Sequence, residues 1–240
     1  MWGGGAMRLA AVTAAVAASA CMADSLPPVV DDEQGSGESP SQAHESLAES
    51  LVGVTPLTVV GSGHDARGSL IRVEASRKGR DELATGSLRE VELAVLGGYI
   101  DVRALDGDAA AIRDLVIDID DVSLPEGIVS PDVRFTGVHA RIARPESFEM
   151  TWGERGERAE AIVSLDLIVD WGVSVDGGKM HPLAPVNIKN LEMVLELSRG
   201  ERGGIEAQLA GFRDGVFYEW GGVVELRGLA LDVRAGDVQH

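Results

Sequence analysis

The thiol of Cys21 is the side chain whose position points most clearly to a chemistry. It is the only cysteine among 240 residues. It directly follows a run of small and apolar residues, Leu9 to Ala20. A lone thiol excludes an internal disulfide, and the absence of cysteine after it excludes Cys-based zinc sites, iron–sulfur clusters and thiol nucleophiles from the rest of the chain. The chemistry of this thiol therefore depends on the segment before it.

The segment before Cys21 has the parts of a secretory signal. Arg8 is its only charged residue, Leu9 to Ala18 supply an apolar stretch, and Ala18-Ser19-Ala20 supply the small residues of a cleavage site. The apolar stretch is far shorter than the ~20 residues that span a bilayer. We therefore predict a signal peptide at residues 1–20, with Met7 as an alternative start to Met1.

The tetrapeptide Ala18-Ser19-Ala20-Cys21 resembles the lipobox of bacterial lipoproteins, except that leucine is usual where Ala18 stands. In that family the thiol receives a diacylglycerol, the leader is cut before the cysteine, and the new amino terminus is usually acylated. The resemblance implies lipidation of Cys21, with acyl chains such as palmitate anchoring a cell-envelope protein to a membrane. In some lipoproteins an Asp directly after the cysteine holds the protein at the inner membrane. Met22 and Ala23 stand there instead, so the resemblance implies the outer membrane, facing the periplasm or the cell surface. Ala18-Ser19-Ala20 also suits ordinary signal peptidase, so simple secretion is the alternative.

Gly61-Ser-Gly-His-Asp-Ala66 matches the G-x-G-x-x-A pattern of dinucleotide-binding turns. That pattern binds a pyrophosphate only where a helix begins and its amide donors face the ligand. Here Arg67-Gly68 lead into the strand pattern of residues 69–75. The sequence predicts a hairpin loop at this point and no cofactor.

Histidines and acids form no recognisable catalytic or metal-binding pattern. The five histidines lie far apart in the sequence, and neither H-E-x-x-H nor G-x-S-x-G occurs. Asp118, Asp120 and Asp121 lack the glycine that an EF-hand loop requires, and the first two alternate with isoleucines. We predict that they are the solvated face of a strand, that the protein holds no metal, and that it is not an enzyme.

Aromatic residues are few, and most lie in the second half of the chain. Four of the ten cluster around the turn at Asp214-Gly215, and Trp152 and Trp171 lie at the ends of predicted strands. Core packing is one interpretation; the other is a rim around the mouth of a ligand groove, because amphipathic rings favour an apolar–polar boundary. The candidate rim residues are Trp152, Trp171, Phe212, Phe217, Tyr218 and Trp220.

Charge and composition divide the chain. The formal net charge is −18, which repels phosphate backbones and excludes nucleic acid as an expected partner. Residues 21–50, which follow the leader, hold seven acids and no Lys or Arg, and their Ser, Pro and Gly content predicts a disordered tether after the lipidated Cys21. A weak helix is possible near residues 42–51. Residues 51–240 suffice for one domain with its own core.

The domain pattern alternates with period two, which is typical of half-buried antiparallel strands. Gly and Asp-Gly pairs separate the strands and indicate hairpins or bulges. The sequence predicts an all-β domain of about ten strands. Its expected form is a single curved, mostly antiparallel sheet, or else a sandwich or open barrel.

A faint repeat runs through the domain. Three strings share one order: an apolar residue, a polar residue, then Asp, Asn or Gly, then apolar residues at every second place. They are residues 112–119, 188–195 and 226–233, with 135–142 as a looser copy. A residue of this type inside a strand, followed by a change of phase, indicates a bulge that bends the sheet. Any curved antiparallel sheet can produce such strings. They also resemble, without a specific motif, those of AsmA-type and tubular lipid-binding proteins of the bacterial envelope, whose curled sheets hold acyl chains.

These observations lead to three expected functions. The first is a lipid-anchored, non-enzymatic envelope protein that binds a lipid or another apolar ligand in a groove of its curved sheet. The second is a structural or adaptor lipoprotein that docks another envelope protein through a sheet edge or an aromatic patch. The third is a hydrolase whose site the sequence does not display. An internal apolar channel would separate the first from the second.

Overall fold

The computed structural model describes residues 47–52, 56–63, 68–77, 88–125, 128–129, 132–153, 157–200 and 203–237. Cys21, the predicted leader and residues 22–46 of the predicted tether lie outside the described residues. The all-β class is confirmed, because fourteen strands form one sheet in which every pairing is antiparallel. The elements in chain order are α1 (Leu47–Ser50), β1 (Leu57–Val59), β2 (Leu70–Arg77), β3 (Leu88–Leu93), β4 (Val95–Ala104), β5 (Ala109–Ile119), β6 (Val122–Ser123), β7 (Val133–Ile142), β8 (Glu146–Glu149), β9 (Thr151–Trp152), β10 (Arg158–Val175), β11 (His181–Pro182), β12 (Val186–Arg199), β13 (Ile205–Trp220) and β14 (Val224–Gly236).

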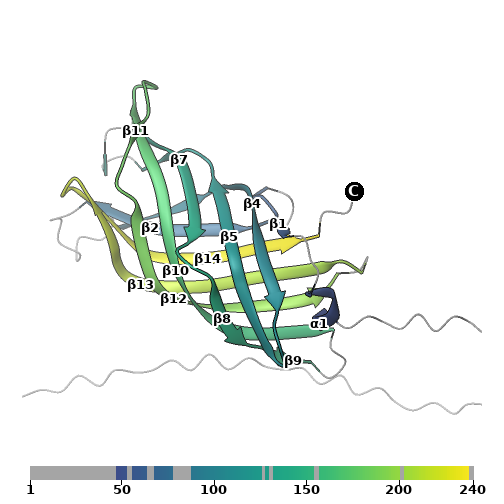
Figure 1. Ribbon diagram of the computed structural model, residues 1–240. Helices are drawn as coiled ribbons and strands as arrows, with labels where there is room; N and C mark the ends of the chain where they lie inside the picture. The colour runs from purple at the N-terminus through teal and green to yellow at the C-terminus, as the bar shows by residue number, and fades with distance from the viewer. Residues whose placement is uncertain are drawn as a thin grey trace, which may run out of the picture. The chain divides into compact units, whose positions relative to one another are not determined.

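The sheet is single and curved, and it closes on itself. Strand β1 pairs with both β4 and β14, so that β1, β4, β5, β7, β10, β12, β13 and β14 form a ring. The ring order follows the chain order. The other strands lie beside these or prolong them; β2, for example, continues β1 along β14. In Figure 1, β5, β7 and β10 cross in front of β12, β13 and β14 at a steep angle.

The repeated strings coincide with bulges, as the sequence predicts. The third residue of each string is Asp114, Gly137, Asn190 or Gly228, and at each of these places the register between neighbouring strands shifts. Three of the four have positive φ, between 51° and 61°. The Asn190 N–H donates to the Asp166 carboxylate on the opposing strand at 2.8 Å. The bulges increase local twist and bending, which lets long strands curve around one interior.

The glycine-rich segment Gly61–Ala66 is followed by strand β2, as predicted, but the expected hairpin is wrong. Strands β1 and β2 do not pair with each other; they run one after the other along β14. The Val60 N–H donates to the carbonyl of Arg234 at 2.8 Å, and the Ser69 N–H donates to the carbonyl of Val60 at 3.1 Å. Residues 61–68 therefore separate two parts of one interrupted strand, and residues 64–67 lie outside the described residues.

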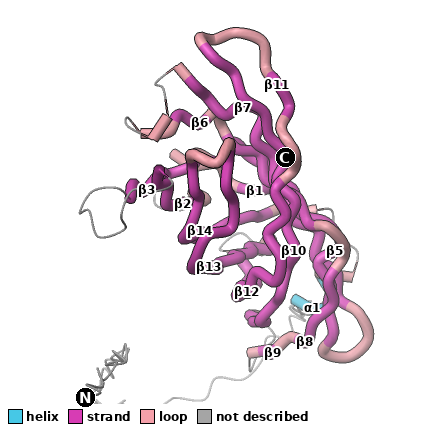
Figure 2. Tube along the Cα trace, turned by 90° about the vertical axis from the view of Figure 1, so that its left-hand side faces the viewer, coloured by secondary structure: helices cyan, strands magenta, loops and turns pink. Residues whose placement is uncertain are grey.

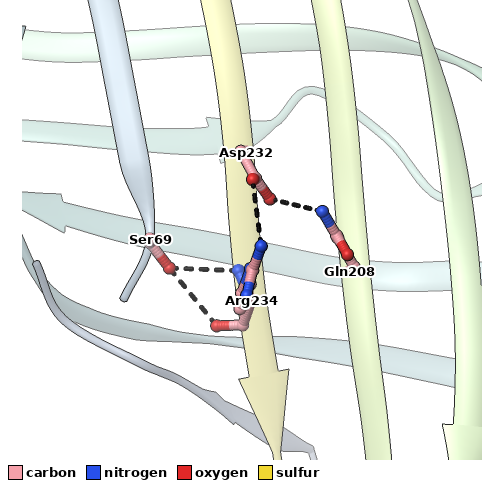
Figure 3. Close-up of polar contacts among 4 residues, drawn as sticks. All are labelled: Ser69, Gln208, Asp232 and Arg234. Atoms are coloured by element: carbon pink, nitrogen blue, oxygen red, sulfur yellow. Dashed lines mark hydrogen bonds and ion pairs between the residues drawn. The ribbon is translucent and has the colours of Figure 1, made fainter. Parts of the chain in front are cut away.

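The buried Ser69 side chain holds this junction. Its hydroxyl oxygen accepts a hydrogen bond from the Arg234 N–H at 3.0 Å and donates to the Arg234 carbonyl at 3.3 Å. The Arg234 guanidinium forms an ion pair with Asp232 at 3.5 Å, and Asp232 accepts a hydrogen bond from Gln208 at 2.9 Å (Figure 3). These contacts connect the start of β2 to β14 and β13.

One end of the closed sheet is filled by helix α1; we call it the plugged end. Leu47 and Leu51 have no exposed surface and belong to the core. Arg199, at the end of β12, donates to the Ser50 hydroxyl at 2.9 Å. The folded unit therefore begins before residue 51, where the sequence placed its start, because these two leucines are needed to cover the interior.

The opposite end, which we call the open end, lies at the last residue of β2, the first of β3 and the turn between β13 and β14. Here the ring of hydrogen bonds is interrupted. Among the described strands, β3 pairs with β2 alone and β6 with β7 alone, although β4 and β5 pair as far as Val95 and Ile119. Figure 2 shows β6 and β7 apart from β2, β3 and β14. The sheet is thus joined around the plugged end and separates between β3 and β6.

Candidate functional site

An apolar cavity of about 100 Å³ lies inside the sheet toward the open end. Every residue that lines it is apolar, and together they come from both sides of the separation between β3 and β6. Its lining residues are Ile71, Val73, Leu93, Ile119, Val122, Leu124, Phe135, Val138, Ala140, Leu167, Val169, Trp171, Val186, Ile188, Phe217, Leu226, Leu229 and Leu231. A cavity without polar groups holds no water stably and favours a hydrocarbon group.

The cavity lies where the strands separate because side chains fill the rest of the interior. Leu165, Leu191, Leu195 and Leu197 are at most 1% exposed and belong to the same core as the plug. An eight-strand closed sheet is narrow enough to be filled by side chains, or to hold one small ligand. In this sheet, side chains fill the interior toward the plugged end, and room for a small ligand remains where β3 diverges from β6.

Aromatic rings form a continuous cluster beside the cavity. Phe135 stacks on Trp171 with ring centroids 5.0 Å apart, and it meets Trp220 edge-on at 5.4 Å. Trp171 in turn meets Tyr218 edge-on at 4.7 Å. Trp171, Tyr218 and Trp220 remain partly exposed, and they pack against the buried core. The cluster therefore forms part of the boundary between the apolar interior and the surrounding water at the open end.

Four of the six candidate aromatic residues lie at the cavity or beside it. Trp171 and Phe217 line the cavity, and Tyr218 and Trp220 belong to the ring cluster beside it. Phe212 lies on β13 with 63% of its surface exposed and lines no part of the cavity.

Trp152 lies at the plugged end, in a hollow of about 850 Å³ that is lined by both apolar and charged residues. That hollow is lined by three arginines and three glutamates, so its charges balance: Arg158, Arg199, Arg234, Glu160, Glu196 and Glu206. The structure therefore brings four of the six candidate aromatic residues together and leaves Trp152 and Phe212 apart from them.

Phe135 is the site residue that the aromatic pattern missed. It lies far in sequence from the cluster near residue 214, yet it contacts Trp220 of that cluster and also Trp171. One signal was available: Phe135 opens the fourth repeated string, at the apolar position before the bulge at Gly137. The same bulge opposes Trp171 in the neighbouring strand, because Asp170 pairs with His139 and Gly172 with Thr136. The repeat therefore marks the site as well as the bend.

Polar and ionisable groups lie outside the cavity. His139 and Asp118 form a hydrogen bond at 2.7 Å on the outer face, with side chains 39% and 52% exposed. Their neighbours in a shallow hollow include Leu96 and two glycines, Gly97 and Gly137. Among the described residues, no group of three or more His, Cys, Asp or Glu is placed to hold a metal ion.

Burial raises the pKa of Tyr218 above its ordinary value of 10.0. The neutral phenol is thus favoured in the folded state. The stability that it contributes is fully present below pH 10, and it is lost as the pH rises through the higher pKa that Tyr218 has in the folded protein. We expect Tyr218→Phe to reduce the fall in melting temperature between pH 9 and pH 11, measured by circular dichroism. An unchanged fall would contradict the partial burial of this hydroxyl.

No protein-family model, curated protein or solved structure matches this chain. In the part of the chain that the structure describes, no helix has the length and apolar character to cross a membrane. The interpretation of the site therefore depends on its own geometry.

Proposed function

We propose that the protein is a lipid-anchored envelope protein that binds an apolar ligand, with a hydrocarbon group of the ligand in the cavity at the open end. One observation carries this proposal: the cavity is lined by apolar residues alone and lies where the strands separate. Burial of a hydrocarbon there removes apolar surface from water on both sides, at ~25 cal/mol per Å². The anchor is the acyl group expected on Cys21.

The size of the cavity limits what it takes. An apolar cavity of about 150 Å³ is known to bind benzene, so a cavity of about 100 Å³ accommodates a short hydrocarbon end rather than a whole lipid. The rest of the ligand must lie outside, among the half-buried rings of Trp171, Tyr218 and Trp220. This arrangement fits a single-chain amphiphile whose polar group stays in water.

Ala140→Leu tests the proposal because Ala140 is buried and lines the cavity. The added methyl groups would occupy the existing space, so we expect the free energy of unfolding to fall by less than about 1 kcal/mol, which is below the usual effect of overpacking. Affinity for decanoate, measured by titration calorimetry, should fall at least about tenfold, which corresponds to 1.4 kcal/mol.

Ala210→Leu is the matched control, since Ala210 is only partly buried, lies on β13 and does not line the cavity. Its decanoate affinity should equal that of the wild type. Equal affinity of the wild type and Ala140→Leu, or a wild type that binds no single-chain amphiphile, would refute the cavity as the ligand site.

The adaptor function has one observation in its favour. In the described residues, β3 has a pairing partner along one edge only, and an unpaired edge can accept an extended segment of another protein. This edge carries Arg89, Glu90 and Glu92, and charges of this kind oppose strand addition. A wild type that binds no amphiphile but captures a strand-forming peptide would favour the adaptor function.

A further inference from the structure

The hairpins around the open end carry exposed aliphatic side chains at their tips. Leu88 begins β3, Val175 ends β10, and Val223 lies in the turn between β13 and β14; they are 41%, 50% and 40% exposed. Met180, in the turn after β10, is 47% exposed. Single exposed apolar residues are ordinary on protein surfaces. These residues share one end of the sheet, which is also the end at which the cavity lies.

We infer that the open end docks on the surface of a neutral lipid bilayer and takes its ligand directly from it. This inference rests on the proposed function. The proposed ligand has a hydrocarbon end that must reach a cavity without polar groups, and a bilayer is the source of such a ligand. When the tips enter the apolar boundary of the bilayer, the ligand passes from hydrocarbon to cavity without full exposure to water. The unfavourable hydration of its chain is thereby avoided.

The side chains at the open end match the layers of a bilayer surface. The exposed side chains of Leu88, Val175 and Val223 can enter the acyl boundary. The partly exposed Trp171, Tyr218 and Trp220 pack against the protein core. Tryptophan and tyrosine are enriched where a membrane meets water, because each ring has an apolar body and a polar atom. At the plugged end, by contrast, Leu47 and Leu51 close the interior.

Shape and charge distinguish a bilayer from other occupants. A protein partner needs a continuous contact surface of about 800 Å² on each side, whereas the aliphatic tips stand on separate hairpins. A soft surface can receive each tip independently. The net charge of −18 opposes approach to anionic lipids, so the inferred surface is neutral.

The experiment compares two full-length variants in a Cys21→Ser background, which removes any acyl chain from the measurement. One variant carries Leu88→Asp, Val175→Asp and Val223→Asp. The control carries the same number of aspartates at exposed apolar positions away from the open end: Val52, Leu105 and Ile162. Flotation with phosphatidylcholine vesicles measures docking, and decanoate titration without vesicles measures the cavity.

The parent and the control variant should float with neutral vesicles, and the open-end variant should bind them at least about tenfold more weakly. All three should bind decanoate equally in solution. Unaltered flotation of the open-end variant, flotation of the parent only with anionic vesicles, or a parent that binds decanoate but no vesicles would each overturn the docking inference and leave the proposed function intact. A parent that binds neither would overturn both.

Folding of the open-end variant is checked by its melting temperature and by its decanoate affinity. If it does not fold, Val223→Asp alone replaces it, because Val223 lies in a turn outside the strands. Val223→Asp should weaken flotation in the same direction, and equal flotation with the parent would again overturn the inference. Formation of a dimer through the open end, detected by sedimentation and abolished by the aspartates, would assign these tips to a second copy instead.

Discussion

Replacing Gly98 by alanine should abolish folding or reduce the free energy of unfolding by about 4 kcal/mol or more, a loss that few single substitutions cause. Gly98 has a φ of 133°, and a Cβ built on it would lie 2.0 Å from the carbonyl oxygen of Val116. The obstructing atom belongs to the backbone of β5, the strand that pairs with β4 at this position. No side-chain movement can relieve the clash, so the two strands would have to separate.

The neighbouring glycine supplies the control. A Cβ at Gly97 would have no heavy atom within 4 Å, so Gly97→Ala should change stability by less than about 1 kcal/mol. Urea unfolding followed by circular dichroism measures both. Similar stability of the two variants would mean that β4 and β5 do not approach each other as described. Because this pairing ends near Ile119, where β3 and β6 separate, Gly98→Ala should also remove binding of decanoate.

The local features of the fold could be read from the sequence because they depend on neighbouring residues. Alternation of apolar side chains indicated antiparallel strands, and the long strand β10 shows this alternation over most of its length. The third residue of each repeated string marked a bulge because Asp, Asn and Gly tolerate a local change of backbone direction. Both signals are contained within about eight residues.

Features that depend on distant pairing could not be read in the same way. Closure of the ring requires β1 to pair with β14, nearly 180 residues later, and no local pattern specifies it. The segment after Gly61 has the composition of a hairpin loop. The structure instead carries it as an insertion, because β14 offers its edge to the strands on both sides of it.

The site was predictable in part for the same reason. Phe217, Tyr218 and Trp220 are close in sequence, and their grouping was visible. The pairing of β10 with β7 brings Trp171 and Phe135 together, and they contact Tyr218 and Trp220 of β13, a strand that pairs with neither. The cavity itself arises from the absence of a strand partner for β3 among the described residues, and a sequence pattern records which residues can pair rather than which remain unpaired.

The plug at the other end gives the second large effect. Leu51 has no exposed surface and belongs to the core, although it follows a segment with the composition of a disordered tether. Leu51→Ala should reduce the free energy of unfolding by about 2–5 kcal/mol, because it leaves a cavity that the surrounding strands fill only partly. Val52, the next residue, is 70% exposed, so Val52→Ala should change stability by no more than about 0.5 kcal/mol.

Both plug variants are compared by urea unfolding, with decanoate affinity as a second measurement. The plugged end and the cavity lie at opposite ends of the sheet, so Leu51→Ala should lower stability while leaving decanoate affinity within about twofold of the wild type. Equal stability of the two variants would show that helix α1 does not cover the interior. A loss of decanoate affinity in the folded Leu51→Ala protein would instead place the ligand along the whole interior. The interior would then be one channel between the two ends of the sheet, rather than a cavity at the open end that is closed off by the plugged end.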